Sequence, residues 1–292
     1  MNTISKLSKT TAIALCALAL GITENALATS GTGQSANSLK VIGLTDDGRL
    51  VRFQSDKPGR SREIGFVTGL VGNDVALVGI DFRVQDGKLY GVGNGGGVYT
   101  IDPRTGVASF VNSLNFNGNP VALSGTFFGV DFNPAADRLR IVSDTGQNLA
   151  HNVNAGGTTS DPNVGMLNNG ANPPVLVLGV SGAAYTNNDL QPNTATTLFD
   201  INAMSDQVVI QSPPASGALT PTGSLGVDAG SWVGFDIYST LVGGVTVNNR
   251  AFASLVVGGK YGFYQINPLT GAAKRVGKFN DTVVDIAVRL NQ

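Results

Sequence analysis

Four aspartates occupy matching positions in short apolar segments of this sequence, and their type and spacing could support chemistry. They are Asp81, Asp131, Asp236 and Asp285. Each segment has the composition of a β-strand, and repeated strands of this kind can surround a common axis. Carboxylates gathered there repel one another unless a cation, arginines or backbone N–H groups compensate them. We therefore expect either a Ca²⁺-type metal site, because hard cations prefer oxygen ligands, or a structural role in which each aspartate hydrogen-bonds to the neighbouring repeat.

A polar loop with the sequence SDTGQN separates two predicted strands and is the second candidate site. Loops on a rigid scaffold commonly carry binding residues. The expected ligand-binding side chains, including two arginines from the preceding strand, are Asp144, Gln147, Asn148, Arg138 and Arg140. These groups could bind sugar hydroxyls or a cation. The same Asp-Thr-Gly sequence also favours a turn in which Asp144 caps its own backbone, so both interpretations stay open.

The chain has a single histidine, which excludes many kinds of catalytic site. A Ser-His-Asp or Cys-His site needs a histidine base that a third group orients. His151 instead lies in an alternating, strand-like segment beside asparagines, so we expect it to be structural or at the surface. Zinc or copper sites with several His or Cys ligands are excluded in one subunit, since the one cysteine is Cys16. We predict no catalytic residue, and we expect the only tryptophan, Trp232, in the core.

The repeated positions follow a regular period that points to the architecture. With Ala184 in the third place, the equivalent residues are separated by 50, 53, 52 and 49 positions. The repeat that begins near residue 77 contains four predicted strands joined by short turns, which is one antiparallel meander. A period near 50 built from four strands is typical of β-propeller blades. One repeat fits less well, because no second strand is evident between residues 180–185 and 197–202.

The two ends of the repeating region complement each other. Residues 40–67 contain the later strands of a repeat without its first, and residues 283–288 form a first strand without the rest. We therefore predict an all-β fold: a five-bladed β-propeller of four-stranded antiparallel blades, closed by pairing of the N- and C-terminal strands. Closure also removes exposed sheet edges that favour aggregation. A β-sandwich or an open stack of sheets would explain the composition, but not the regular spacing.

The first 28 residues have the features of a secretory signal peptide. Lys6 and Lys9 precede an apolar stretch at residues 11–22, and Ala-Leu-Ala follows as a cleavage site. The apolar stretch is shorter than the ~20 residues that a membrane helix needs. We expect a cleaved signal at residues 1–28, a disordered lead-in at 29–38 and a single propeller domain at 39–292. The protein should then be exported, to the periplasm or the extracellular space.

Composition limits the expected partners. Without Lys6, Lys9 and Glu24 of the signal, 17 basic and 19 acidic residues remain, a net charge of −2. No run of Lys or Arg supplies the basic footprint that nucleic acids or anionic lipids require. We expect no nucleic-acid partner, no membrane insertion, and a monomer that binds a small molecule, a glycan or another component of the extracellular matrix.

Residues 127–157 resemble the most recognisable part of a bacterial secreted family, the domain of unknown function 4394. The similarity is closest in residues 129–134, 137–140, 142–149, 184–187, 196–201 and 223–228. Within these segments the loop at 143–149 is the most specific. The resemblance covers most of the chain after residue 39. It implies a propeller-like, exported protein of unsettled biochemistry, and it gives no catalytic residues to assign to this chain.

Two functions of different classes fit these features. The first is a non-enzymatic protein that binds a ligand or matrix component through its loop-bearing face, with structural Ca²⁺ as the one cofactor that the residues suggest. The second is a metal-dependent hydrolase or lyase with its site in the central channel and the four aspartates as ligands or bases. Calcium-dependent propeller lactonases and sugar lyases are the analogy, and fold alone does not establish function. A purely structural envelope or matrix protein is the third alternative.

Overall fold

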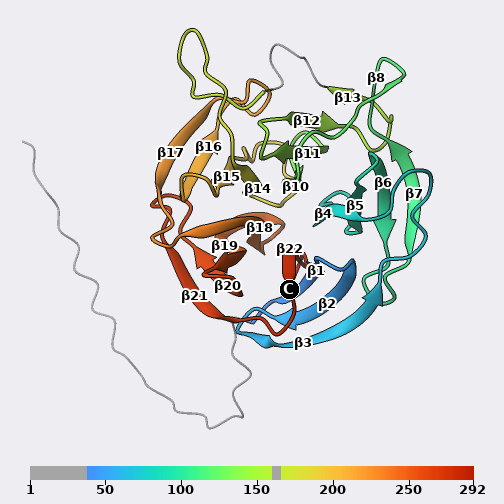
Figure 1. The fold of residues 1–292 in the computed structure, drawn as a ribbon, viewed down its shortest axis with the longest axis vertical. Coiled ribbons are helices and arrows are strands. Elements are labelled where there is room, and N and C mark those ends of the chain that lie inside the picture. Colours follow the sequence, from blue (N-terminus) through green and yellow to red (C-terminus); the bar gives the residue numbers. More distant parts are fainter. Residues whose placement is uncertain (1–37, 160–165) are drawn as a thin grey trace, which may run out of the picture. The chain divides into compact units, whose positions relative to one another are not determined.

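The computed structural model of the chain describes residues 38–159 and 166–292. The predicted signal peptide, residues 1–28, and all but the last residue of the predicted lead-in, 29–38, lie outside this part. The described residues form strands and turns and contain no helix. Five four-stranded antiparallel sheets are arranged in a ring (Figure 1), which confirms the predicted five-bladed propeller.

The first blade combines strands from the two ends of the described chain. From the axis outward it contains β22 (Val283–Val288), β1 (Lys40–Thr45), β2 (Arg49–Gln54) and β3 (Lys57–Phe66). β22 and β1 are antiparallel, with Val288 opposite Val41 and Asp285 opposite Leu44. The predicted closure is confirmed, and backbone hydrogen bonds complete the ring.

Each of the other four blades consists of four consecutive strands, which follow one another from the axis outward. The second blade contains β4 (Leu77–Phe82), β5 (Leu89–Gly93), β6 (Gly97–Ile101) and β7 (Ala108–Ser113). The third contains β10 (Phe128–Asn133), β11 (Arg138–Ser143), β12 (Asn148–His151) and β13 (Thr158–Thr159). The fourth contains β14 (Val180–Tyr185), β15 (Leu198–Asn202), β16 (Gln207–Gln211) and β17 (Leu219–Ser224). The fifth contains β18 (Ala229–Val242), β19 (Val245–Val257), β20 (Lys260–Ile266) and β21 (Ala273–Lys278). A small hairpin, β8 (Asn115–Phe116) with β9 (Asn119–Pro120), follows the second blade.

The fourth blade is regular, although its sequence conceals this. The segment at residues 197–202 is itself the second strand, β15, and it pairs with both β14 and β16. A long connection over residues 186–197 separates β14 from β15. Hairpin loops usually have about two to five residues, so the length of this connection hides the repeat.

Glycines allow the innermost strands to approach one another closely. Four of the five innermost strands carry a glycine two residues before the repeated position: Gly79, Gly129, Gly182 and Gly234. A Cβ at Gly129 would lie 2.5 Å from the backbone N of Ala183 in the next blade. A Cβ at Gly234 would lie 2.5 Å from the Cα of Asp285. Glycine in a strand interior often marks such a backbone contact, and here it sets the width of the ring at its axis.

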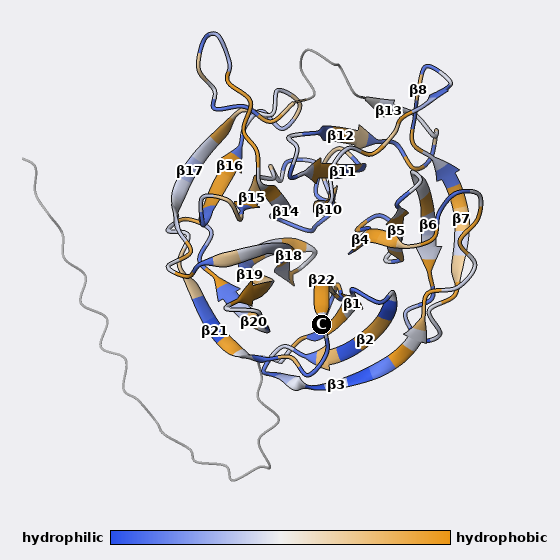
Figure 2. Ribbon diagram, viewed as in Figure 1, coloured by the Kyte–Doolittle hydropathy of each residue, from blue (hydrophilic) through white to orange (hydrophobic). Residues whose placement is uncertain are grey.

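The hydrophobic core is divided among the interfaces between neighbouring blades. Each of five buried clusters combines residues from two adjacent sheets. Between the fifth and first blades, Phe263 stacks on Phe252 with ring centroids 5.3 Å apart and meets Phe53 edge to face at 5.2 Å. Figure 2 shows β4 and β22 as largely hydrophobic. Burial at these interfaces holds the innermost strands in place, and those strands carry the candidate site.

Candidate functional site

Three of the four repeated aspartates meet at the axis of the ring. Carboxylate oxygens of Asp81, Asp131 and Asp236 lie within 4.8 Å of one another, and all three side chains are buried. They come from β4, β10 and β18, the innermost strands of the second, third and fifth blades. Asp285 on β22 is also buried but is not part of this group. Ala184 occupies the equivalent position in the fourth blade.

Each aspartate also accepts a hydrogen bond from the backbone of the following or closing blade. The bonds run from Phe132 N to Asp81 (2.8 Å), from Tyr185 N to Asp131 (3.1 Å), from Val288 N to Asp236 (2.5 Å) and from Ile80 N to Asp285 (2.7 Å). Carboxylates that accept backbone N–H groups satisfy buried donors as well as themselves. These bonds match the structural role that the repeated positions suggest. They leave lone pairs on the carboxylate oxygens that a cation could use.

The electrostatics of the three carboxylates need compensation. Two carboxylate charges 4.8 Å apart would repel by about 3.5 kcal/mol at an effective dielectric constant of about 20. Burial and then the neighbouring charges raise the pKa of Asp81 and Asp131 well above the usual range of a carboxyl. Burial raises the pKa of Asp236 to about 6, although the N–H of Val288 opposes this. The group therefore either keeps protons near neutral pH or holds a cation.

The donor set fits a hard cation. Carboxylate oxygens are the ligands that Ca²⁺ and Mg²⁺ prefer, whereas zinc and copper sites are usually built with nitrogen or sulfur. The one histidine of the chain, His151, takes no part in the group. Asp81, Asp131 and Asp236 would supply three of the six or more oxygen ligands of Ca²⁺, so water or a bound ligand would complete the shell.

A pocket of about 180 Å³ lies at the ends of the innermost strands. Its walls include residues from all five of these strands, among them Leu77, Phe128, Ser181, Trp232 and Val284. In β4, β10 and β18 the innermost pocket residues precede the axial aspartates by three or four positions, which is a distance of about 10–13 Å along an extended strand. The pocket is smaller than the roughly 300–1,000 Å³ of drug-sized sites, so it suits a small ligand.

Aromatic and polar groups converge in this axial pocket. Phe127 and Trp232 meet edge to face, with ring centroids 4.9 Å apart and planes at 88°. The Ser181 Oγ is buried and has no hydrogen-bond partner among the described residues. The expectation that Trp232 belongs to the core is wrong, since 37% of it is exposed. Trp232 lies two residues before the Gly-x-Asp pattern of β18, near the start of this innermost strand. The starts of the innermost strands form the pocket, so this position places Trp232 in its wall.

The predicted SDTGQN loop positions one wall of the pocket. The Asp144 Oδ1 accepts hydrogen bonds from the backbone N of Thr126 (2.9 Å) and of Phe127 (3.3 Å). Gln147 bonds the same incoming segment, through Ser124 N at 2.9 Å and Ala122 O at 2.9 Å. The polar ends of both side chains thus bind the protein's own backbone. Their effect on the axial pocket is to hold Phe127.

The other predicted ligand-binding residues lie apart from that loop. Arg140 and Asn148 are buried between the third and fourth blades, where Arg140 donates to Asn148 Oδ1 (2.7 Å) and Tyr185 Oη (3.2 Å). Gln211 donates to the same Asn148 oxygen at 3.1 Å. Arg138 lies at the opposite end of β11 and donates to backbone carbonyls of its own turn. The five predicted residues therefore do not converge on one surface.

His151 is fully buried and joins the second and third blades. Its Nε2 lies 2.8 Å from Asn112 Oδ1 and its Nδ1 lies 2.9 Å from Thr158 Oγ1. The amide oxygen of Asn112 can only accept, so we assign the proton to Nε2. Burial, helped by the charge of Arg138, lowers the pKa of His151 to about 4 and keeps the ring neutral. This is the structural role expected from the sequence.

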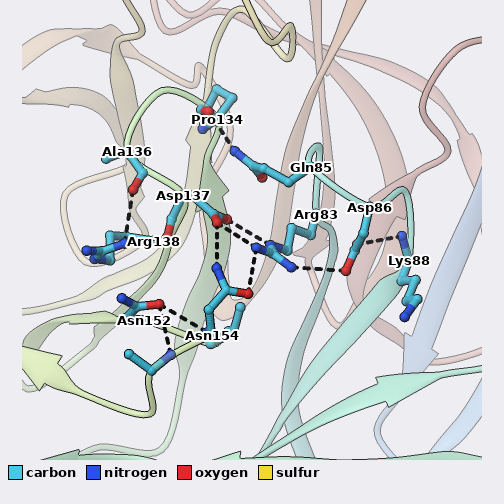
Figure 3. A network of polar contacts seen from close by, with 12 residues as sticks. Arg83, Gln85, Asp86, Lys88, Pro134, Ala136, Asp137, Arg138, Asn152 and Asn154 are labelled. Atoms are coloured by element: carbon cyan, nitrogen blue, oxygen red, sulfur yellow. Dashed lines mark hydrogen bonds and ion pairs between the residues drawn. The ribbon is translucent and has the colours of Figure 1, made fainter.

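A polar network that the sequence does not reveal joins the second and third blades beyond the far ends of β4 and β10 (Figure 3). Arg83 donates to both carboxylate oxygens of Asp137, at 2.7 and 2.5 Å, and to Asp86 at 3.0 Å. Asn154 bonds Arg83 and Asp137 at once. The guanidinium of Arg83 lowers the pKa of Asp137. Two-pronged Arg–carboxylate pairing is geometrically specific, and we interpret this network as a clamp between blades.

The described part of the chain contains no helix that is long and apolar enough to cross a membrane.

Solved structures with similar folds have low sequence identity to this chain. A protein of unknown function from Bacteroides thetaiotaomicron is 13% identical, with 88% of this chain and 68% of that one covered and a TM-score of 0.45. A putative 6-phosphogluconolactonase from Bacteroides fragilis is 11% identical, with 88% and 99% covered and a TM-score of 0.39. An auxiliary nutrient binding protein from Bacteroides ovatus is 12% identical, with 80% and 57% covered and a TM-score of 0.37. No protein of curated function matches the sequence.

The family comparison agrees with the resemblance noted in the loop and its flanking strands. The model of a family described as a domain of unknown function matches residues 49–287, which include four complete blades and most of the mixed first blade. The chain therefore belongs to the DUF4394 family.

Proposed function

We propose that the protein is an exported, non-enzymatic propeller that binds a small ligand in the axial pocket, above a divalent cation held by Asp81, Asp131 and Asp236. The observation that carries this proposal is the convergence of all five innermost strands on the pocket. The signal-like sequence at residues 1–28 supports export to the periplasm or extracellular space.

The walls of the pocket favour a small sugar or a similar polyhydroxylated molecule. Trp232 and Phe127 offer aromatic surface, and the Ser181 hydroxyl can donate or accept a hydrogen bond. Aromatic faces pack against the C–H groups of a ligand while hydroxyls bind its polar edge. Ca²⁺ is the proposed cation, because it tolerates irregular oxygen shells better than Mg²⁺ does.

A metal-dependent hydrolase or lyase at the same place is the second candidate. The raised pKa of the axial carboxyls favours it, since a buried carboxyl that keeps its proton can act as a general acid. Such a reaction would need the substrate to reach the axial aspartates from the pocket. Turnover of a lactone or an acidic sugar that disappears in Asp131→Asn would favour this candidate over simple binding.

Thermal melting with Ca²⁺ and with EDTA tests the cation. A cation at 100 times its dissociation constant adds about 2.7 kcal/mol to the stability of the folded state, which corresponds to about 5–10 °C in a domain of this size. The shift should vanish in Asp131→Asn, whose amide can still accept the hydrogen bond from Tyr185. Asp200→Asn is the matched control, because Asp200 is buried outside the group of three. A melting temperature that responds to neither treatment would rule out the cation.

The fluorescence of Trp232 tests the pocket, since it is the only tryptophan in the chain. Titration with a panel of neutral monosaccharides should shift its emission for at least one of them. Ser181→Ala should weaken that response, whereas a substitution at the exposed Lys88, which lies near the opposite end of β4 from the pocket, should not. A response that Ser181→Ala leaves unchanged would place the ligand elsewhere.

A further inference from the structure

A groove between the first and second blades collects positive charge that is dispersed in the sequence. Its volume is about 510 Å³, and seven of the 17 lysines and arginines after residue 28 line it. No acidic side chain is among the described residues of its lining. The cations come from β1, β2 and β3, from the turn after β6 and from the residue after β22. The fold therefore builds a basic surface on a chain whose net charge is slightly negative.

Most of these cations lack an ion-pair partner in the described part of the chain. Five of them form no ion pair with any residue in the described part of the chain: Lys40, Arg52, Arg60, Arg62 and Arg289. The remaining two pair with neighbouring aspartates, Lys57 with Asp56 at 3.3 Å and Arg104 with Asp102 at 3.3 Å. The five unpaired side chains are exposed, so their charges are available to a ligand.

The register of the first blade places two of these charges directly against each other. Arg52 on β2 lies opposite Arg62 on β3. Val51 and Phe53 on either side of Arg52 are buried, which turns Arg52 to the exposed face of the sheet. Like charges directly opposite each other in neighbouring strands destabilise a sheet. Figure 2 shows the resulting hydrophilic stretches along β2 and β3.

The chemistry of the groove selects a ligand with several anionic groups. Guanidinium groups bind carboxylates and sulfates through paired N–H donors, and the groove is too large for a single anion. Nucleic acids and peptides usually add stacked bases or side-chain pockets to charge attraction. Here the apolar lining residues Val41, Ile42 and Phe53 are each at most 4% exposed. They therefore offer no surface on which a base could stack and no pocket for a peptide side chain. Charge along an open groove is the recognition element that the surface provides.

We propose that this groove binds a linear acidic polysaccharide, whose uronate or sulfate groups pair with Lys40, Arg52, Arg60, Arg62 and Arg289. Binding would attach the propeller to an anionic matrix or capsule. The site is separate from the axial pocket and does not depend on its function.

Fluorescence anisotropy with labelled oligosaccharides tests the proposal. The two probes are an oligogalacturonate, which carries carboxylates, and a heparin oligosaccharide of similar length, which adds sulfates. We expect at least one to bind at low ionic strength and to dissociate as salt is raised, because the contacts are ionic. Arg52→Gln with Arg62→Gln should weaken binding at least tenfold. The melting temperature of this double variant should stay the same or rise, since it removes the opposed charges.

The control removes two exposed charges away from the groove. Lys260→Gln with Arg275→Gln should change the affinity less than threefold, and Trp232→Phe should leave polysaccharide binding intact. Equal weakening by the groove and control variants would overturn the site, because it would indicate attraction by overall charge alone. The absence of binding by both oligosaccharides would overturn the proposal. Tighter binding of polyglutamate, polyphosphate or single-stranded DNA in the same groove would overturn the choice of ligand.

Discussion

Asp200 shows how differently one residue type can be used at buried positions. The axial aspartates accept backbone N–H groups, whereas neither carboxylate oxygen of Asp200 has a hydrogen-bond partner among the described residues. Burial raises the pKa of Asp200 to about 8, even though the charge of Arg140 acts in the opposite direction. A buried charge without a hydrogen bond is costly, and a carboxyl in such a place remains protonated instead.

Asp200 should therefore make the folded protein less stable as the pH rises. The folded state retains a proton that the unfolded state releases near pH 4, so this stabilisation is complete below about pH 4. It is lost as the pH rises toward 8, the approximate pKa in the folded state. Between these limits we expect the free energy of unfolding to fall by roughly 1 kcal/mol per pH unit, in addition to the contribution of the axial aspartates.

Urea denaturation of Asp200→Asn from about pH 5 to pH 8, in EDTA, measures this contribution. The amide does not ionise, so the slope of stability against pH should become less negative in the variant. Asp228→Asn removes an exposed aspartate and should leave the slope unchanged. The same slope in Asp200→Asn and the natural protein would show that Asp200 is ionised when folded.

At the scale of elements, the Gly-x-Asp pattern of the innermost strands combines two physical tasks. The glycine lets two strands approach, and the aspartate two residues later accepts a backbone N–H across the gap. The fourth and first blades each depart from this pattern. Ala184 replaces the acid in β14, and Val283 replaces the glycine in β22. The axial group is therefore asymmetric, with three carboxylates together and Asp285 apart from them.

Gly129→Ala tests the close approach of the third and fourth blades. The new methyl group would lie 2.5 Å from the backbone N of Ala183, and backbone atoms cannot move away as a flexible side chain can. Overpacking of this kind typically costs about 1–3 kcal/mol. Gly157→Ala is the control, since a Cβ there meets nothing within 4 Å and its φ is not positive. Chemical denaturation should show a loss for Gly129→Ala that is well above the change for Gly157→Ala.

The sequence is sufficient to predict the blades, their closure and the meeting of the axial aspartates, but not the axial pocket or the basic groove. The period near 50 and the turn residues are local signals, so the blades and their closure can be identified from them. Asp81, Asp131 and Asp236 share a position in the repeat, and their meeting follows from the ring. The axial pocket is different, because Ser181 and Trp232 come from separate blades and share no motif. The same is true of the basic groove, in which Arg104 and Arg289 join β1–β3 only after folding.

At the scale of the whole molecule, stability depends on how the ring is closed. The pairing of β22 with β1 joins the last described strand to the first through backbone hydrogen bonds. The two ends of the described part also meet there, since Lys40 N donates to Gln292 Oε1 at 2.6 Å. The chain runs across all five interfaces between blades, and the break between the ends of its described part falls inside the first blade instead. In the other blades the chain itself connects the first strand to the second, whereas in the mixed blade only the pairing of β22 with β1 joins them.

Two circular permutants can separate the effect of the mixed blade from that of the chain order. In both, a short glycine linker joins residue 292 to residue 38. One is opened between Gly258 and Gly259, inside the fifth blade, which then becomes the mixed blade. The other is opened at Gly226, between the fourth and fifth blades, and has no mixed blade. Added atoms at these glycines would meet nothing within 4 Å, so both openings lie in open space.

The permutant opened at Gly226 should unfold at least tenfold faster in guanidinium than the one opened at Gly258. In the first, no strand pair joins the fourth and fifth blades once the chain is cut, so side-chain packing and isolated hydrogen bonds such as Ala229 N to Asp206 must hold the ring closed. In the second, β19 still pairs with β20 across the new ends, as β22 pairs with β1 in the natural order. Trp232 fluorescence reports the unfolding rate in both proteins. Equal rates would mean that packing between the blades, and not the mixed blade, limits the opening of the ring.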